Sequence, residues 1–155
     1  MRAENLMSHP PITCHVNDTL SVAAQLMWNN DCGAVVVTND EGKLVGMITD
    51  RDICMCALTQ GRPLDELLVN GAMAKHVVSA HATDTIADIE QKMAEHQVRR
   101  IPVIDDDRKP IGMVSLHDLA IESVQPDSSM KNAATKVAHT LAAVSHPRHP
   151  RGKAA

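Results

Sequence analysis

The chain has 155 residues, of which 44% are hydrophobic and 22% charged, and its formal net charge is −4. These values are typical of a globular protein and exclude a disordered or fibrous chain. With one Trp and no Tyr or Phe, the chain lacks the stacking rings and the basic charge of nucleic-acid binders, and its net charge does not favour anionic membranes. No apolar run approaches 18 residues and no export signal is visible, so we expect a cytoplasmic protein without a membrane span.

The sequence contains an internal repeat with a period of 66 residues. Residues 7–54 align without a gap to residues 73–120, and 12 of these 48 pairs are identical. Unrelated sequences of average composition would share about three. Three pairs of methionines mark the period: Met7/Met73, Met27/Met93 and Met47/Met113.

Both repeats predict the same elements in the same order. The predicted strands cover residues 12–14, 34–38 and 44–48 in the first repeat and residues 77–79, 101–104 and 111–114 in the second. A helix follows the first strand, beginning after Thr19 or Thr85, and a second helix closes each repeat, at 50–58 or 116–123. One such unit has a marginal core, so we expect the two to pack together. The predicted fold class is α/β (α+β), with two β-α-β-β-α repeats in pseudo-two-fold symmetry.

The repeats suggest boundaries along the chain. We expect repeat 1 at 5–58, a linker with a short helix at 59–71, repeat 2 at 72–123, a C-terminal helix within 124–145 and a basic flexible tail at 146–155. The C-terminal helix is predicted to dock through one apolar stripe, made of Ala134, Val137, Leu141 and Val144.

One motif, Gly-apolar-apolar-Ser/Thr-x-x-Asp, occurs in both repeats, at 46–52 and 112–118. Its hydroxyl residue is placed where a strand becomes a helix, and the free backbone N–H groups of a helix start favour an anion. Its Asp, three residues on, could accept two hydrogen bonds from a vicinal diol. Together, the hydroxyl residue and the Asp are suited to binding a ribose phosphate. The same pattern is also that of a plain capping box, which would stabilise only the helix.

The two repeats resemble a pair of CBS domains (cystathionine β-synthase domains), also called a Bateman module, over roughly residues 5–123. The resemblance rests on both motifs, on the strand 98–105 and on the openings at Thr13 and Ser79. Residues 49–53 and 96–100 are similar to stand-alone bacterial two-CBS proteins of the hypoxic response type. This implies a regulatory stress-response module, not an enzyme, that binds AMP, ADP, ATP or S-adenosylmethionine between the repeats. It also implies a homodimer and an unidentified protein partner, with no required cofactor.

The resemblance also implies roles for eight residues. Asp52 and Asp118 would hold ribose hydroxyls, Thr49 and Ser115 would approach phosphate, Thr13 and Ser79 would line the adenine or ribose end, and Arg99 and Arg100 would face phosphate. The first repeat has Gly33 and Ala34 at the positions of the two arginines. Because guanidinium groups bind phosphate in bidentate geometry, we expect the site of Ser115 and Asp118 to be the better one.

Two other functions fit the sequence. The chain could be a structural or protein-interaction module without a ligand, as the Gly33-Ala34 pair suggests for one site. It could also be a thiol or metal sensor that uses its four cysteines, Cys14, Cys32, Cys54 and Cys56. We expect these thiols to be reduced, no catalytic residues and no bound metal. Part of the expected dimer contact is the stripe Leu20, Ala23, Ala24 and Met27 on the first helix.

Overall fold

The structure is a computed structural model that describes residues 1–123 and 133–145. The expected tail, 146–155, and the first part of the segment assigned to the C-terminal helix, 124–132, lie outside the described residues.

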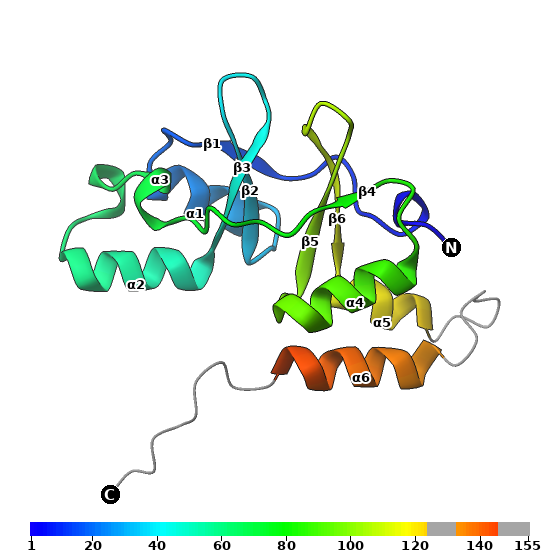
Figure 1. Cartoon of the computed structure of the whole chain (residues 1–155). Helices are drawn as coiled ribbons and strands as arrows, with labels where there is room; N and C mark the ends of the chain where they lie inside the picture. Colours follow the sequence, from blue (N-terminus) through cyan, green and yellow to red (C-terminus); the bar gives the residue numbers. More distant parts are fainter. Residues whose placement is uncertain (124–132, 146–155) are drawn as a thin grey trace, which may run out of the picture.

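Each repeat contains three strands and two long helices (Figure 1). The first repeat consists of β1 (Thr13–His15), α1 (Leu20–Asn29), β2 (Ala34–Thr38), β3 (Leu44–Thr49) and α2 (Asp50–Gln60). The second consists of β4 (Ala80–His81), α4 (Ile86–His96), β5 (Arg100–Ile104), β6 (Pro110–Ser115) and α5 (Leu116–Ser123). The other helices are η1 (Ala3–Asn5), η2 (Leu64–Glu66), α3 (Val69–Ala72) and α6 (Ala133–Ser145). The predicted α/β fold of two β-α-β-β-α repeats and a C-terminal helix is confirmed.

The two sheets have the same topology. Their strand orders are β1-β2-β3 and β4-β5-β6, and the middle strand runs parallel to the first and antiparallel to the third. Even a local irregularity repeats, because the pairing shifts between Val37 and Thr38 and again between Val103 and Ile104. The middle strands are buried runs of apolar residues, as expected for strands covered on both faces.

Helix starts follow from local hydrogen bonds. At the start of α4, the Asp88 N–H donates to Thr85 Oγ1 (3.2 Å), and the Thr85 N–H donates back to Asp88 Oδ2 (2.9 Å). This reciprocal pair is the capping box expected from the sequence. Thr19 caps α1 more simply, by accepting from the Val22 N–H at 3.4 Å.

The segment that leads into each repeat packs on the other repeat. The N-terminal segment packs on the second repeat, where the Ala3 N–H donates to the Asp84 carbonyl (2.9 Å) and Ser8 exchanges two backbone hydrogen bonds with Met113 (2.9 and 3.0 Å). The segment that enters the second repeat packs on the first, and the Met47 and Ala74 backbones exchange bonds of 3.0 and 2.8 Å. Each repeat is therefore completed by chain that belongs in sequence to the other.

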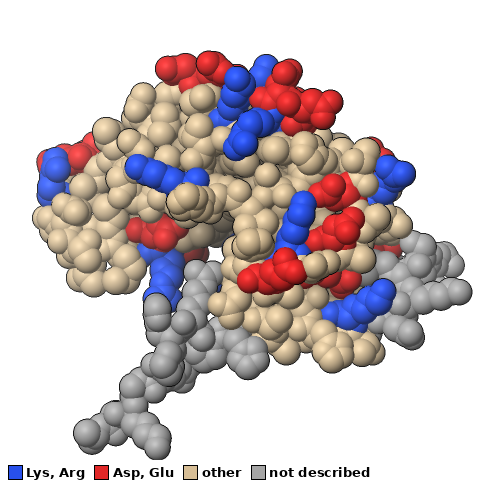
Figure 2. All heavy atoms as spheres, viewed as in Figure 1, with Lys and Arg blue, Asp and Glu red and all other residues tan. Residues whose placement is uncertain are grey.

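The repeats also meet through their sheets. Val36 and Leu44 of the first repeat form one buried cluster with Ile104 of the second. The Leu44 N–H donates to the Arg108 carbonyl across the boundary at 2.9 Å. The two hairpin tips lie side by side at the top of Figure 1, and Figure 2 shows acidic and basic side chains mixed there. The repeats thus form one module with a shared core.

Helix α6 covers the outer helices of the second repeat only. It packs against α4 and α5, whereas no described element covers α1 and α2 in the same way (Figure 1). Val137 is buried, as predicted. Leu141 is 50% exposed, and the buried residue at this point of the helix is Thr140, which is 5% exposed. The predicted stripe was wrong at this position: Thr140, three residues after Val137, is buried with it, whereas Leu141 lies on the exposed side of α6.

Candidate functional site

Both predicted motifs form capping boxes at a strand-to-helix junction. In the first repeat, the N–H and Oγ1 of Thr49 donate to Asp52 Oδ2 at 2.9 and 2.8 Å, and the Asp52 N–H donates to Thr49 Oγ1 at 3.2 Å. Ser115 and Asp118 repeat this arrangement at 2.8, 2.6 and 3.2 Å. The helix-capping interpretation of the motif therefore holds. Each box leaves the second carboxylate oxygen, Oδ1, without a hydrogen-bond donor among the described residues.

The two boxes differ in the residue that stands opposite the hydroxyl. In the second sheet Arg100 is the cross-strand partner of Ser115, and in the first sheet Ala34 is the partner of Thr49. Paired residues of an antiparallel ladder project from the same face, with Cβ atoms about 5 Å apart. Arg100 therefore projects from the same face of the sheet as Ser115, and the first repeat has no basic residue at the equivalent position.

The Arg100 side chain also reaches the first repeat. Its Nη2 atom lies 3.7 Å from the position that a Cβ atom would take on Gly33, and Asp50 Oδ2 lies 3.0 Å from the same position. Arg100 thus spans the boundary between the repeats, from Ser115 to Gly33. Sequence reasoning missed Asp50, which occupies an unspecified position of the motif and whose equivalent in the second repeat is Leu116.

Arg99 and Arg100 have no direct carboxylate partner in the described part of the chain, although the Asp50 carboxylate and the Arg100 guanidinium both approach Gly33. Within residues 1–123 and 133–145, Arg99 and Arg100 make no ion pair. Arg99 is exposed, and its carbonyl accepts a hydrogen bond from the Leu116 N–H at 2.9 Å. Each of the two guanidinium groups is thus able to bind an anion through charge-assisted hydrogen bonds.

Thr13 and Ser79 lie at the first strand of each repeat, apart from the capping boxes. Thr13 is exposed on β1 and pairs in register with Val36. Ser79 directly precedes β4, and its carbonyl accepts a hydrogen bond from Lys92 Nζ at 3.1 Å. Lys92 also bonds to Asp84 Oδ2 at 2.7 Å. Burial raises the pKa of the Asp84 carboxyl, but the Lys92 and His81 contacts outweigh it and hold the pKa below its usual value.

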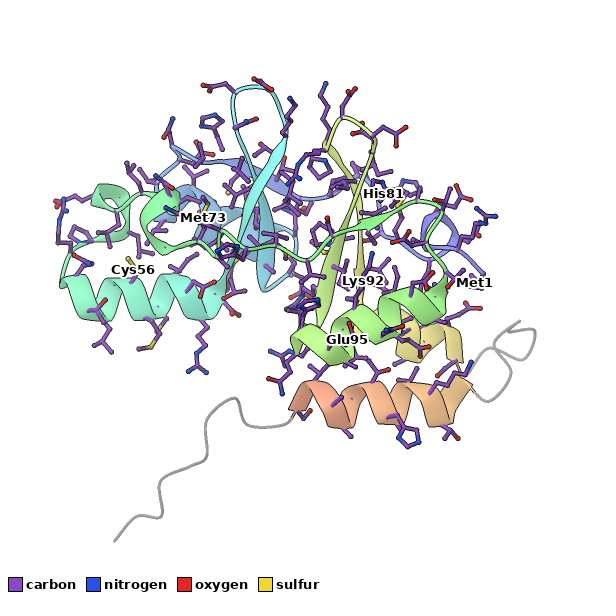
Figure 3. The ribbon with its side chains drawn as sticks, viewed as in Figure 1. Met1, Cys56, Met73, His81, Lys92 and Glu95 are labelled. Atoms are coloured by element: carbon purple, nitrogen blue, oxygen red, sulfur yellow. The ribbon has the colours of Figure 1, made fainter. Side chains whose placement is uncertain are left out.

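The motif glycines are in contact with methionines. A Cβ on Gly46 would lie 2.5 Å from Met73 Sδ, and a Cβ on Gly112 would collide with Met7. Figure 3 shows Met73 over the first repeat, although it precedes the second in sequence. Each motif glycine therefore leaves room for a methionine from the segment that packs across from the other repeat. Their presence in the motif is no independent sign of a ligand.

Two pockets stand out on the described surface, and no predicted site residue lines either. The larger, about 650 Å³, lies between α1 and α2 and includes Trp28, Gly33 and Asp50 in its lining. The smaller, about 290 Å³, surrounds Lys92 on α4. The predicted residues therefore lie outside both of these pockets.

The cysteines do not converge on a metal site. Among residues 1–123 and 133–145, no group of three or more His, Cys, Asp or Glu side chains could hold a metal ion. Burial, with repulsion from Asp18, raises the pKa of the Cys14 thiol to about 11. Cys54 is exposed, and Cys32 and Cys56 are half-buried. In the part of the chain that the structure describes, no helix is long and apolar enough to cross a membrane.

Comparison with known proteins identifies the repeats. The CBS domain profile matches residues 3–58 and 67–125. The CBS domain-containing protein YhcV of Bacillus subtilis is 35% identical over 136 residues, which cover 88% of this chain and 94% of that protein. Hypoxic response protein 1 of Mycobacterium tuberculosis is 36% identical over 110 residues, or 70% of this chain and 76% of that protein.

A solved structure with the same fold holds adenosine-containing ligands. The CBS domain pair of protein MJ0100, in complex with 5′-methylthioadenosine and S-adenosyl-L-methionine, has a TM-score of 0.70 and 29% sequence identity. The match covers 78% of this chain and 94% of that one. Some relatives with enzyme names are much longer, and this chain spans only 22% of the L-aspartate semialdehyde sulfurtransferase of Methanocaldococcus jannaschii. The likeness to such enzymes thus extends to a small part of their length.

Proposed function

The chain belongs to the CBS domain family as a pair of CBS repeats, and from this membership we propose that it senses an adenosine nucleotide and acts by binding, without catalysis. The candidate ligands are AMP, ADP, ATP and S-adenosylmethionine. The ligand would lie at the boundary between the repeats and favour one arrangement of them, which a protein partner would recognise. The cytoplasmic location, the stress-response role and the partner stay predictions.

The observation that carries the proposal is the position of Arg100. Its backbone pairs with Ser115 in the sheet of its own repeat, and its guanidinium reaches Gly33 of the other repeat without an ion pair in the described chain. A phosphate there would meet an unpaired cation, a hydroxyl and the positive end of α5. The second oxygen of Asp118 would accept from ribose hydroxyls. Thr49 and Asp52 would form a weaker site, because Ala34 supplies no cation.

Titration calorimetry of Arg100→Ala tests this assignment. Loss of one charge-assisted hydrogen bond, about 1.5–3 kcal/mol, would weaken AMP binding about 10- to 150-fold. Arg62→Ala is the matched control, because Arg62 pairs with Glu66 at 3.2 Å in the segment after α2 and is expected to leave binding unchanged. Wild-type protein that binds none of the four ligands would refute the function. Unchanged binding by Arg100→Ala would refute the site.

The inequality of the two sites is tested with Asp118→Asn and Asp52→Asn. Replacement by Ala would also remove a capping box, at a cost of about 0.5–2 kcal/mol, so the shape-conserving amide is preferred. We expect the Asp118 variant to lose more affinity than the Asp52 variant at similar thermal stability. Equal losses would contradict the inequality.

A module without a ligand is the second candidate, and two observations favour it. In both boxes one carboxylate oxygen is already used within the cap, and no predicted site residue lines either pocket. Thermal-shift measurements with the four ligands distinguish the two functions, since only a ligand that binds the folded state raises the melting temperature.

A further inference from the structure

The Asp50 carboxylate lies close to the Arg100 guanidinium at the boundary between the repeats. Asp50 Oδ2 and Arg100 Nη2 are 3.0 and 3.7 Å from the position that a Cβ atom would take on Gly33. The two groups form no direct ion pair in the part of the chain that the structure describes. Each of them can therefore bind a charged group of a ligand that reaches this point.

Local hydrogen bonds hold the Asp50 carboxylate in this position. Asp50 is the first residue of α2, and its N–H donates to the Gly33 carbonyl at 3.2 Å. Its Oδ1 atom accepts from the Arg51 N–H at 2.7 Å. The other oxygen, Oδ2, faces Gly33 and has no hydrogen-bond donor among the described residues. Asp50 is exposed, so a ligand can approach this oxygen from solvent.

The equivalent point of the second repeat has a different charge. The same backbone hydrogen bond occurs there, from the Leu116 N–H to the Arg99 carbonyl at 2.9 Å, so Arg99 corresponds to Gly33 and Leu116 to Asp50. The second repeat thus has a cation and an apolar side chain where the first has no side chain and a carboxylate. Helix α5 begins with Leu116, so a strand-to-helix junction of this kind does not require an acidic residue at this position.

A guanidinium and a carboxylate that approach one point match the two charges of an α-amino acid. On the basis of the proposed function, we propose that Asp50 selects the ligand at this boundary, and that this ligand is an adenosine whose 5′ substituent ends in an α-amino acid, as in S-adenosylmethionine. Arg100 binds the amino-acid carboxylate, in the place described above for a phosphate, and Asp50 accepts from the ammonium group. Among the four candidate ligands only S-adenosylmethionine carries an ammonium group, whereas AMP, ADP and ATP end in phosphates, which the Asp50 carboxylate repels.

Titration calorimetry with S-adenosylmethionine, 5′-methylthioadenosine and ATP tests this selection. 5′-Methylthioadenosine shares the adenosine and the sulfur atom but lacks the amino acid. Wild-type protein should bind S-adenosylmethionine more tightly than either of the other two. Asp50→Asn removes the charge and keeps an Oδ1 acceptor for the Arg51 N–H. It is expected to weaken binding of S-adenosylmethionine about tenfold or more, to leave 5′-methylthioadenosine unchanged and to strengthen ATP binding.

Asp106→Asn is the matched control for the loss of one negative charge. Asp106 is exposed in the turn between β5 and β6, at the opposite end of these strands from Arg100 and Ser115. This variant should bind all three compounds as wild type does. Because Asp50 and Asp106 are both exposed, both variants should melt close to the wild-type temperature. S-adenosylhomocysteine, which keeps the amino acid and has a neutral sulfur, should lose affinity for Asp50→Asn as S-adenosylmethionine does.

Three outcomes would overturn the selection by Asp50 and leave the proposed function intact. The first is wild-type protein that binds ATP more tightly than S-adenosylmethionine. The second is an Asp50→Asn variant that changes the affinity for all the compounds by the same factor, or for none, since a purely structural role would not alter the preference. The third is an effect confined to S-adenosylmethionine and absent with S-adenosylhomocysteine, which would assign Asp50 to the sulfonium. Wild-type protein that binds none of the compounds would instead refute the proposed function, and the selection with it.

Discussion

Arg100 distinguishes the two repeats at the scale of single residues. Pseudo-symmetry places Ala34 at the same point of the other sheet, so the hydroxyls of Ser115 and Thr49 have different neighbours despite identical caps. The cysteines differ in a similar way. Cys14 is enclosed in the core of the first repeat, whereas Cys54 is exposed on α2.

This difference predicts the order in which the thiols react. The thiolate is the reactive form, and a rise in the Cys14 pKa from 9.0 to about 11 lowers its thiolate fraction about 100-fold below pH 9. With an alkylating reagent near pH 8, we expect Cys54 to be labelled first and Cys14 last, as followed by peptide mass spectrometry. In denaturant both should react alike. Rapid labelling of native Cys14 would contradict the burial of its thiol and would support the thiol-sensor hypothesis.

At the scale of elements, the contact between α4 and α6 contains a buried carboxylate whose hydrogen bonding is incomplete. Glu90 is 8% exposed, and its Oε1 atom has no hydrogen-bond partner among the described residues. Burial raises the pKa of this carboxyl, and Lys136 on α6 lowers it only in part. A buried acceptor without a donor costs about 1–3 kcal/mol, so the docking of α6 carries a penalty while Glu90 is ionised.

Glu90→Gln is therefore expected to stabilise the protein at neutral pH. Because the folded-state pKa is raised above the usual 4.5, wild type loses stability as the pH rises from about 4.5 through the folded-state value, whereas the amide does not titrate. Urea unfolding should show a gain of about 1 kcal/mol at pH 7 that disappears near pH 4. Glu95→Gln, exposed on the same helix, serves as the control. A gain that persists at low pH would contradict the ionisation argument.

At the scale of the whole molecule, the segments that pack across from one repeat to the other and a shared cluster couple the repeats. Met7 packs on Gly112 of the second sheet and Met73 on Gly46 of the first, so neither unit can unfold without exposing chain from the other. The cluster of Val36, Leu44 and Ile104 adds a buried contact between the sheets. The molecule is expected to unfold in one transition.

Ile104→Ala tests this coupling. Removal of a buried isoleucine side chain from the shared cluster should cost about 2–5 kcal/mol, and both repeats should still unfold together. Thermal unfolding followed by far-ultraviolet circular dichroism and by calorimetry, both of which report on the two repeats together, should give coincident curves with a single step. Ile121→Ala, at a half-exposed position on α5, is expected to change stability little. Separate transitions would show that the repeats are independent.

The sequence by itself determined the period of 66, the order of the elements and the capping boxes. These features depend on contacts within a few residues or on the spacing of apolar side chains, which the chain displays directly. The sequence also indicated the inequality of the arginine positions. Only the tertiary structure decided that Met7 and Met73 fill the space beside the motif glycines, that Asp50 approaches Arg100, and that α6 covers one repeat and leaves Trp28 exposed on the other. Each of these depends on which distant segments meet, and internal similarity alone would have predicted two equal halves.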